Sequence, residues 1–165
     1  MMLQVRVLGV ALDAAQQHIV LLKPLLDDPD AQRVLPIWIG AQEATSIVIA
    51  VAGEQAPRPL SHDLMITLLD NLQAQVVRVE VTRIEEGTFY AEITLSTTSG
   101  PRVIDARPSD AIALAVRADA PIFVADEVLD DAGIPAEIED ESIDEPEVDE
   151  FKRFLDDVDP EDFQG

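Results

Sequence analysis

The chain has 165 residues, enough for one domain with a hydrophobic core and too few for two domains of ordinary size. Its 47% hydrophobic residues indicate a globular protein. Its formal net charge is −22, far larger in magnitude than the net charge of about 2–8 that suits a small soluble domain. The absence of cysteine excludes disulfides, thiolate nucleophiles and cysteine-ligated zinc.

The N-terminal segment predicts three strands. Residues 3–12 alternate their side chains with the period of a half-buried strand, and residues 19–22 form a second apolar run. Residues 23–32 hold two prolines and three aspartates, a composition typical of a hairpin connection. Residues 34–40 predict a third strand, in which Pro36 indicates an edge or a bulge.

Two helices are expected next. From Ala41 onward, apolar residues recur at the i, i+3, i+4 and i+7 spacing of an amphipathic helix, and Gly53 suits its C-terminal cap. A proline-rich connector leads to Ser61, the predicted N-cap of a helix that runs to about Gln73. We expect this second helix to bury five apolar side chains, those of Leu64, Ile66, Leu68, Leu69 and Leu72.

The following residues predict a hairpin. Residues 76–84 and 88–96 alternate on either side of a Glu-Gly turn. Three more elements follow: a strand at 102–106, a helix that begins at Pro108 and a short strand at 121–125. Hairpins with interspersed helices predict an α+β (mixed α/β) fold, a single domain with a hairpin-rich mixed sheet and about three packed helices.

The C-terminal end carries most of the charge. Residues 126–165 hold 18 acidic and two basic residues, and so account for 16 of the 22 net negative charges. Such a composition cannot bury a core. We therefore expect a folded domain over residues 1–135 and a mostly disordered acidic tail over 136–165. Within this tail, residues 147–158 predict a short amphipathic helix that docks on its own domain or on a protein partner.

The sequence lacks the features of exported, membrane-spanning and cofactor-binding proteins. Arg6 interrupts the apolar N-terminal stretch, no basic segment precedes it, and no apolar run is long enough to span a bilayer. We expect a cytoplasmic protein. The nucleotide-binding glycine motifs, HExxH and GxSxG are all missing, and His18 and His62 lie 44 residues apart. No organic cofactor is therefore expected.

Two similar segments, RPLSHDL (58–64) and RPSDAIALA (107–115), each place Arg-Pro, serine and aspartate at the start of a predicted helix. Capping is one interpretation, because serine and aspartate satisfy free amides and complement the helix dipole. In the other, these helix ends together with Arg58 and Arg107 bind anions or phosphates. Composition alone favours capping.

His62 is the only histidine beside an acid, and by itself it is typical of an exposed surface residue. If Asp63, Asp105 or Asp110 lies close to it in the fold, the group could bind a divalent cation, Mg²⁺ or Mn²⁺, and activate water for phosphodiester hydrolysis. Glu43, in the first turn of the first helix, is a further candidate ligand, and pairing with the helix dipole is its alternative role.

The main aromatic residues are Trp38 and the Phe89-Tyr90 pair. We expect them to pack in the core or at an interface. The alternative is a stacking platform for single-stranded nucleic acid, but such platforms lie in basic grooves, and basic residues are sparse here.

The segments LPIWIG, RPLSHDL, EGTFYAEI, RPSDAIALA and PIFV, in this order and spacing, resemble the bifunctional nuclease (BFN domain) family over roughly residues 5–132. The tail segment DEFKRFLDDVDPEDF resembles the acidic C-terminal extension of actinobacterial members. The resemblance implies an α/β domain that forms a wedge-shaped homodimer, with a groove at its thick end and cleavage of both DNA and RNA.

The first functional hypothesis is therefore a metal-dependent nuclease. Its expected catalytic residues are His62, Asp63 and Asp110, its metal ligands Asp63, Asp110 and Glu43, and its substrate-binding residues Arg58, Arg107 and Ser109. The acidity opposes nucleic-acid binding, because lysine and arginine dominate phosphate contacts, although a bound cation would reverse the local sign. The alternative is a non-catalytic homodimer that recognises a protein partner or a small anionic ligand, which explains the acidity directly.

Overall fold

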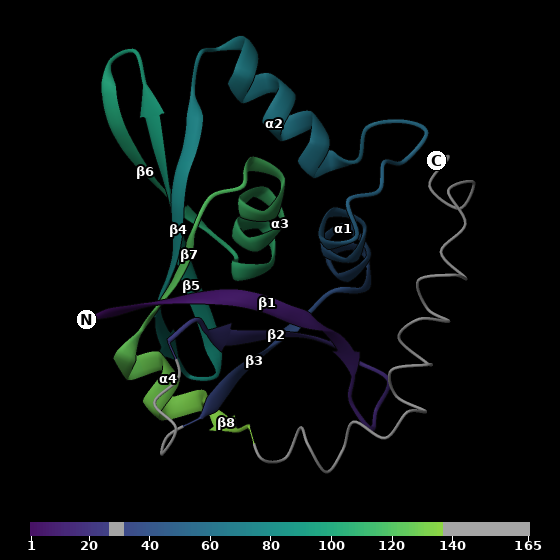
Figure 1. Ribbon diagram of the computed structural model, residues 1–165, viewed down its shortest axis with the longest axis vertical. Helices are drawn as coiled ribbons and strands as arrows, with labels where there is room; N and C mark the ends of the chain where they lie inside the picture. The colour runs from purple at the N-terminus through teal and green to yellow at the C-terminus, as the bar shows by residue number, and fades with distance from the viewer. Residues whose placement is uncertain (27–31, 137–165) are drawn as a thin grey trace.

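The computed structural model describes residues 1–26 and 32–136 (Figure 1). These residues form a mixed sheet with four helices, which confirms the predicted α+β class. The strands are β1 (Met2–Leu12), β2 (His18–Pro24), β3 (Arg33–Ile39), β4 (Gln75–Glu85), β5 (Thr88–Thr97), β6 (Gly100–Ala106), β7 (Ile122–Ala125) and β8 (Ile134–Pro135). The helices are α1 (Ala41–Val51), α2 (Ser61–Asn71), α3 (Pro108–Ala118) and α4 (Asp126–Ala132).

The eight strands lie in the order β6-β5-β4-β7-β1-β2-β3-β8. β4 and β7 pair in parallel, and every other neighbouring pair is antiparallel. The predicted Glu-Gly turn joins β4 and β5, with positive φ at both Glu86 and Gly87, as a tight two-residue hairpin requires. Pro36 pairs with β2 only, since β8 pairs with just Arg33 and Val34, so Pro36 faces the free edge of β3.

The core lies between the sheet and the paired helices α1 and α3. Both helices present a fully buried apolar side chain, Ile47 from α1 and Ile112 from α3. β4 contributes Val79 and Val81 at the spacing of a strand with one inward face. Because α1 and α3 pack on each other and on the strands, their first turns are held at fixed positions.

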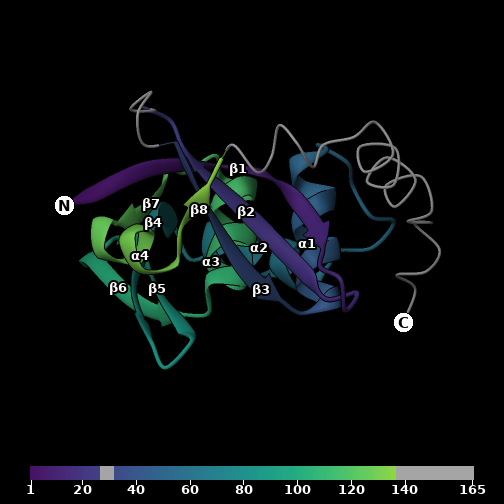
Figure 2. The same cartoon turned by 90° about the horizontal axis from the view of Figure 1, so that it is seen from below.

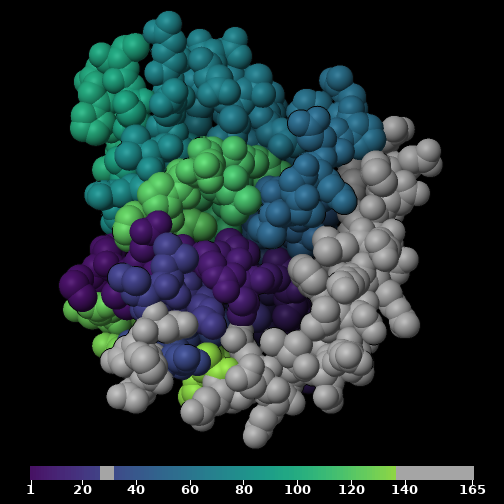
Figure 3. Space-filling model, viewed as in Figure 1, coloured from purple at the N-terminus to yellow at the C-terminus, as the bar shows by residue number. Residues whose placement is uncertain are grey.

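The second helix differs from its prediction in two ways. Its N-cap is Leu60 rather than Ser61. Of the five apolar side chains expected to be buried, Leu64, Leu68 and Leu72 are about half exposed or more, while Ile66 and Leu69 pack partly against the core. These side chains stay exposed because α2 packs mainly on α3 and not on the sheet. The helix lies at the outer edge of the molecule (Figures 1 and 3).

The helix α4 was not predicted, although it lies within the expected folded domain, because its short acidic sequence shows no clear apolar periodicity. It is held by two buried side chains, Val128 and Leu129. It contacts β3, β4 and β7, apart from the other three helices (Figure 2). The predicted tail helix at 147–158 and nearly all of the predicted disordered segment lie outside the described residues. No helix in residues 1–26 and 32–136 is long and apolar enough to cross a membrane.

Candidate active site

The first turns of α1, α2 and α3 meet around an open pocket of about 590 Å³. They meet because α1 packs against α3, and α2 crosses α3 with its first turn next to α1 (Figure 1). The ionisable side chains that line the pocket are Glu43, His62, Arg107 and Asp110. We refer to these four residues as the Arg107 cluster. Residues distant in the sequence are therefore neighbours at a single surface site.

His62 forms the buried side of the cluster, with only 6% of its surface exposed. Its Nδ1 lies 2.6 Å from Ser46 Oγ and its Nε2 lies 2.8 Å from Asp110 Oδ1. The neutral imidazole with its proton on Nε2 satisfies both contacts, because Nε2–H donates to Asp110 while Nδ1 accepts from the serine hydroxyl. The prediction that His62 is exposed is therefore wrong, because the side of α2 that carries His62 packs against α1 and α3.

Arg107 forms the exposed side of the cluster and links two carboxylates. Its Nε donates to Asp110 Oδ2 at 3.0 Å, and its terminal NH2 group donates to Glu43 Oε1 at 2.9 Å. The bond to Glu43 and then that to Asp110 raise the pKa of Arg107 above its ordinary value. The guanidinium is therefore always charged, yet 65% of its side chain is exposed to solvent and to any ligand in the pocket.

Gly40 lets Glu43 reach this position. The residue is the N-cap of α1, and Glu43 lies in the first turn of the same helix. A Cβ atom at Gly40 would collide with the Glu43 carboxylate. Without a side chain at the cap, the carboxylate folds back over the helix N-terminus, where the helix dipole favours negative charge. Both interpretations of Glu43 therefore apply: it complements the dipole and it contacts Arg107.

The cluster as arranged does not fit a metal ion. Among the described residues, no group of three or more histidine, aspartate or glutamate side chains is placed to hold one. One Asp110 oxygen accepts from His62 and the other from Arg107, which also occupies one oxygen of Glu43. A cation would have to displace the guanidinium from both carboxylates.

Asp63 lies outside the cluster. Its Oδ2 accepts the N–H of Leu60 at 2.9 Å, and its Oδ1 accepts from Arg117 Nε at 2.7 Å. Partial burial raises the pKa of Asp63, but the bonds from Arg117 and Leu60 outweigh it, so the net pKa lies below the usual value. The sequence placed this carboxylate among the catalytic and metal-binding residues; here it caps α2 and anchors Arg117.

The other two predicted substrate-binding residues lie at different places. Arg58 is exposed in the connector between α1 and α2, and it makes no hydrogen bond or ion pair within the part of the chain that the structure describes. Ser109, the second residue of α3, is buried and lines a neighbouring groove. Of the predicted site residues, the fold therefore brings together Glu43, His62, Arg107 and Asp110.

Two residues that were not among the predicted site residues, Ser46 and Arg117, hold the cluster in place from its buried side. Ser46 bonds His62 and lies in the apolar stretch of α1, where nothing marks it as functional. Arg117, near the end of α3, has only 8% of its side chain exposed. It donates to Asp63 of α2, to the carbonyl of Ala113 and to the carbonyl of Ser46 in α1. A single arginine thus joins the three helices that carry the site.

Comparison with known proteins identifies the family. Residues 24–137 match the bifunctional nuclease domain. The chain belongs to the bifunctional nuclease domain family. All four residues of the Arg107 cluster fall within the matched range, so this domain contains the whole cluster.

The relatives differ in how much of the chain they cover. An uncharacterized protein of Mycobacterium tuberculosis is 40% identical over 167 residues, 98% of each chain, so the similarity extends into the acidic C-terminal residues. Bifunctional nucleases 1 and 2 of Arabidopsis thaliana are 30% and 31% identical over 94 residues, 55% of this chain and 29% of theirs. The plant proteins are therefore similar over about half of this chain and less than a third of their own length.

Proposed function

We propose that this protein is a nuclease that hydrolyses phosphodiester bonds of DNA and RNA, and that the Arg107 cluster is its active site. The observation that carries the proposal is the exposed guanidinium of Arg107 between two carboxylates, one of them backed by the buried His62. Membership of the bifunctional nuclease domain family and the names of the two plant relatives support the reaction class.

The cluster holds the groups that such a hydrolysis needs. A phosphate entering the pocket meets the exposed Arg107, whose planar fork matches two phosphate oxygens. When the guanidinium turns to the phosphate, its hydrogen bonds to Glu43 and Asp110 are released. A freed carboxylate then accepts a proton from water as the water oxygen bonds to phosphorus and the bond to one sugar oxygen breaks. The departing sugar oxygen takes up a proton from solvent water, the carboxyl group later returns its own proton to solvent, and Arg107 stabilises the charge on the transition state.

His62 acts through Asp110 and is a positioning residue. Both of its ring nitrogens are occupied, and its side chain is almost inaccessible. Its Nε2–H fixes one oxygen of Asp110, so the other oxygen is directed to the pocket. The predicted divalent cation remains a separate proposal, whose test is the effect of a chelator.

Substituting Arg107 by alanine tests the proposal. Full-length protein is assayed on single-stranded and duplex DNA and RNA, with Mg²⁺, with Mn²⁺ and with chelator. We expect Arg107→Ala to lower cleavage about 100-fold, the usual loss for one transition-state donor. Arg102→Ala, which removes an exposed arginine from β6, is the matched control and should cleave like the wild type.

Three outcomes of this assay decide between the hypotheses. Wild-type cleavage by Arg107→Ala would place the active site elsewhere. Failure of the wild-type protein to cleave any substrate under any condition would favour the alternative of a non-catalytic binding or regulatory protein. Undiminished cleavage in chelator would reject metal dependence while leaving the nuclease proposal in place.

We also propose that the protein is a homodimer joined through α2. Leu64, Leu68 and Leu72 recur every four residues and expose an apolar stripe along this helix. We expect Leu68→Glu to convert a dimer to an 18.0 kDa monomer, as measured by light scattering after gel filtration. Val103→Glu, which changes an exposed apolar residue of β6, should remain dimeric. A monomeric wild-type protein would contradict the proposal.

A further inference from the structure

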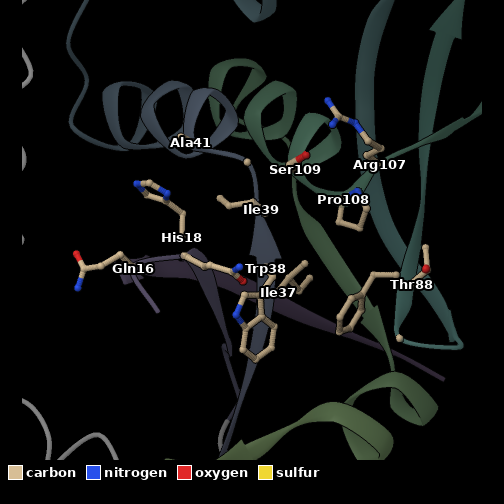
Figure 4. A pocket seen from close by; sticks show the side chains of 14 residues that line it. Gln16, His18, Ile37, Trp38, Ile39, Ala41, Thr88, Arg107, Pro108 and Ser109 are labelled. Atoms are coloured by element: carbon tan, nitrogen blue, oxygen red, sulfur yellow. The ribbon is translucent and has the colours of Figure 1, made fainter. Parts of the chain in front are cut away.

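A second groove, of about 860 Å³, adjoins the active-site pocket and shares Ala41 and Arg107 with it (Figure 4). β3 contributes Trp38 to the groove, the β4–β5 hairpin contributes Thr88 and Phe89, and α3 contributes Ser109. Its size is within the range of small-molecule sites, about 300–1,000 Å³. Arg107 therefore stands between two connected depressions, of which only one contains the carboxylates of the cluster.

Trp38 is the main aromatic surface of this groove. It is 52% exposed, so the predicted packing in the core is wrong, while packing at an interface between subunits stays a prediction. Its Nε1–H donates to Asp13 Oδ2 at 2.9 Å, and this bond is the main cause of the lowered pKa of Asp13. Because the ring is already held in place, stacking a planar ligand on it costs little side-chain entropy.

The charges around the groove suit an anionic ligand. Fourteen residues line it, and none is acidic, although the chain has 33 acidic residues. The ionisable residues in the lining are Arg107 and His18. The lining itself therefore carries no negative charge, although Asp13 bonds Trp38 at its edge, and a phosphate that enters the groove competes with Glu43 and Asp110 for Arg107.

The start of α3 adds unpaired donors. Ser109 is 6% exposed, and its hydroxyl has no hydrogen-bond partner within residues 1–26 and 32–136. The N-cap of α3 is Arg107, which makes no side-chain capping bond. Ser109 therefore does not cap α3, contrary to the capping interpretation of this segment. A hydroxyl without a partner among the described residues, beside a helix N-terminus that has no side-chain cap, is a suitable partner for phosphate oxygens.

We propose that this groove binds the unpaired nucleotides of a single-stranded nucleic-acid substrate. A base stacks on Trp38, and its phosphate contacts Arg107 and the Ser109 hydroxyl, which leads the adjoining phosphodiester bond into the pocket of the Arg107 cluster. The bases of a duplex have their faces covered by neighbours and cannot stack in this way. The inference rests on the proposed nuclease function, and it adds a substrate class, single strands, with Trp38 as the residue that selects it.

The test measures binding separately from cleavage. Trp38 is the only tryptophan of the chain, so its fluorescence reports directly on the groove. Full-length Asp110→Asn protein, used to keep the substrate intact, is titrated with a single-stranded oligonucleotide, with the same sequence as a duplex and with an abasic strand of equal length. We expect quenching by the single strand only. In anisotropy with a labelled single strand, Trp38→Ala should bind about 10-fold or more weakly, and Trp38→Phe nearly as well as the parent.

The results separate this inference from the proposed function. Equal quenching by duplex and single strand, or unchanged single-strand affinity in Trp38→Ala, would overturn the inference even if the wild-type protein cleaves nucleic acid. Selective binding at Trp38 by a protein that cleaves nothing would support the groove and overturn the nuclease. Weaker binding in Trp38→Phe than in Trp38→Ala would also overturn the inference, because a smaller aromatic ring should retain stacking.

Discussion

Asp110→Asn should lower the rate of phosphodiester cleavage about 100- to 1,000-fold, within the range of general acid–base catalysis. The carboxylate has one oxygen on His62 Nε2 and one on Arg107 Nε. Asparagine has nearly the same shape but cannot accept a proton from water at neutral pH. The rate is measured on single-stranded and duplex substrates, with the melting temperature recorded alongside to establish that the variant is folded.

Asp105→Asn is the matched control, because Asp105 is an exposed acid of β6 outside the cluster. This variant should cleave at the wild-type rate. Full cleavage by Asp110→Asn would mean that the activity comes from a contaminant or from another site. His62→Gln should have a smaller effect, a lower kcat with little change in KM, because His62 orients Asp110 and does not touch the substrate.

Arg117→Ala should lower the free energy of unfolding by about 2–4 kcal/mol, somewhat less than the full cost of breaking a buried ion pair because Asp63 is partly exposed. The substitution also leaves the carbonyls of Ala113 and Ser46 without their guanidinium donor. Urea denaturation measures the change. Arg83→Ala is the control, since both partners of its ion pair with Glu85 are more than half exposed, and the expected change is about 1 kcal/mol or less.

The same ion pair makes the stability depend on pH. The folded-state pKa of Asp63 lies below its ordinary value of 3.8, so its contribution is fully present above that value and is lost as the pH falls through the lower, folded-state pKa. The stability difference between the wild type and Asp63→Asn should therefore shrink as the pH drops below about 4. A difference that stays constant through the acid range would show that the Asp63–Arg117 bond contributes nothing measurable.

Local patterns determined most of the secondary structure. Alternating side chains placed the hairpins, and apolar residues at helical spacing placed α1 and α3, because these signals depend only on which side chains face the core. The two failures have one cause. Leu64, Leu68 and Leu72 have the composition of a core, and α4 has that of a tail, yet the first are exposed and the second packs on the sheet. Burial depends on neighbours that a local pattern does not contain.

The site shows the same division. The sequence by itself determined the fold class, the family resemblance and the two Arg-Pro segments at the starts of α2 and α3. It could not separate Asp110, which bonds His62 and Arg107, from Asp63, which anchors Arg117, because both are acids in the first turn of a helix. Only the packing of α1, α2 and α3 decided which carboxylate faces the pocket, since contacts across 48 and 64 residues are set by the tertiary structure.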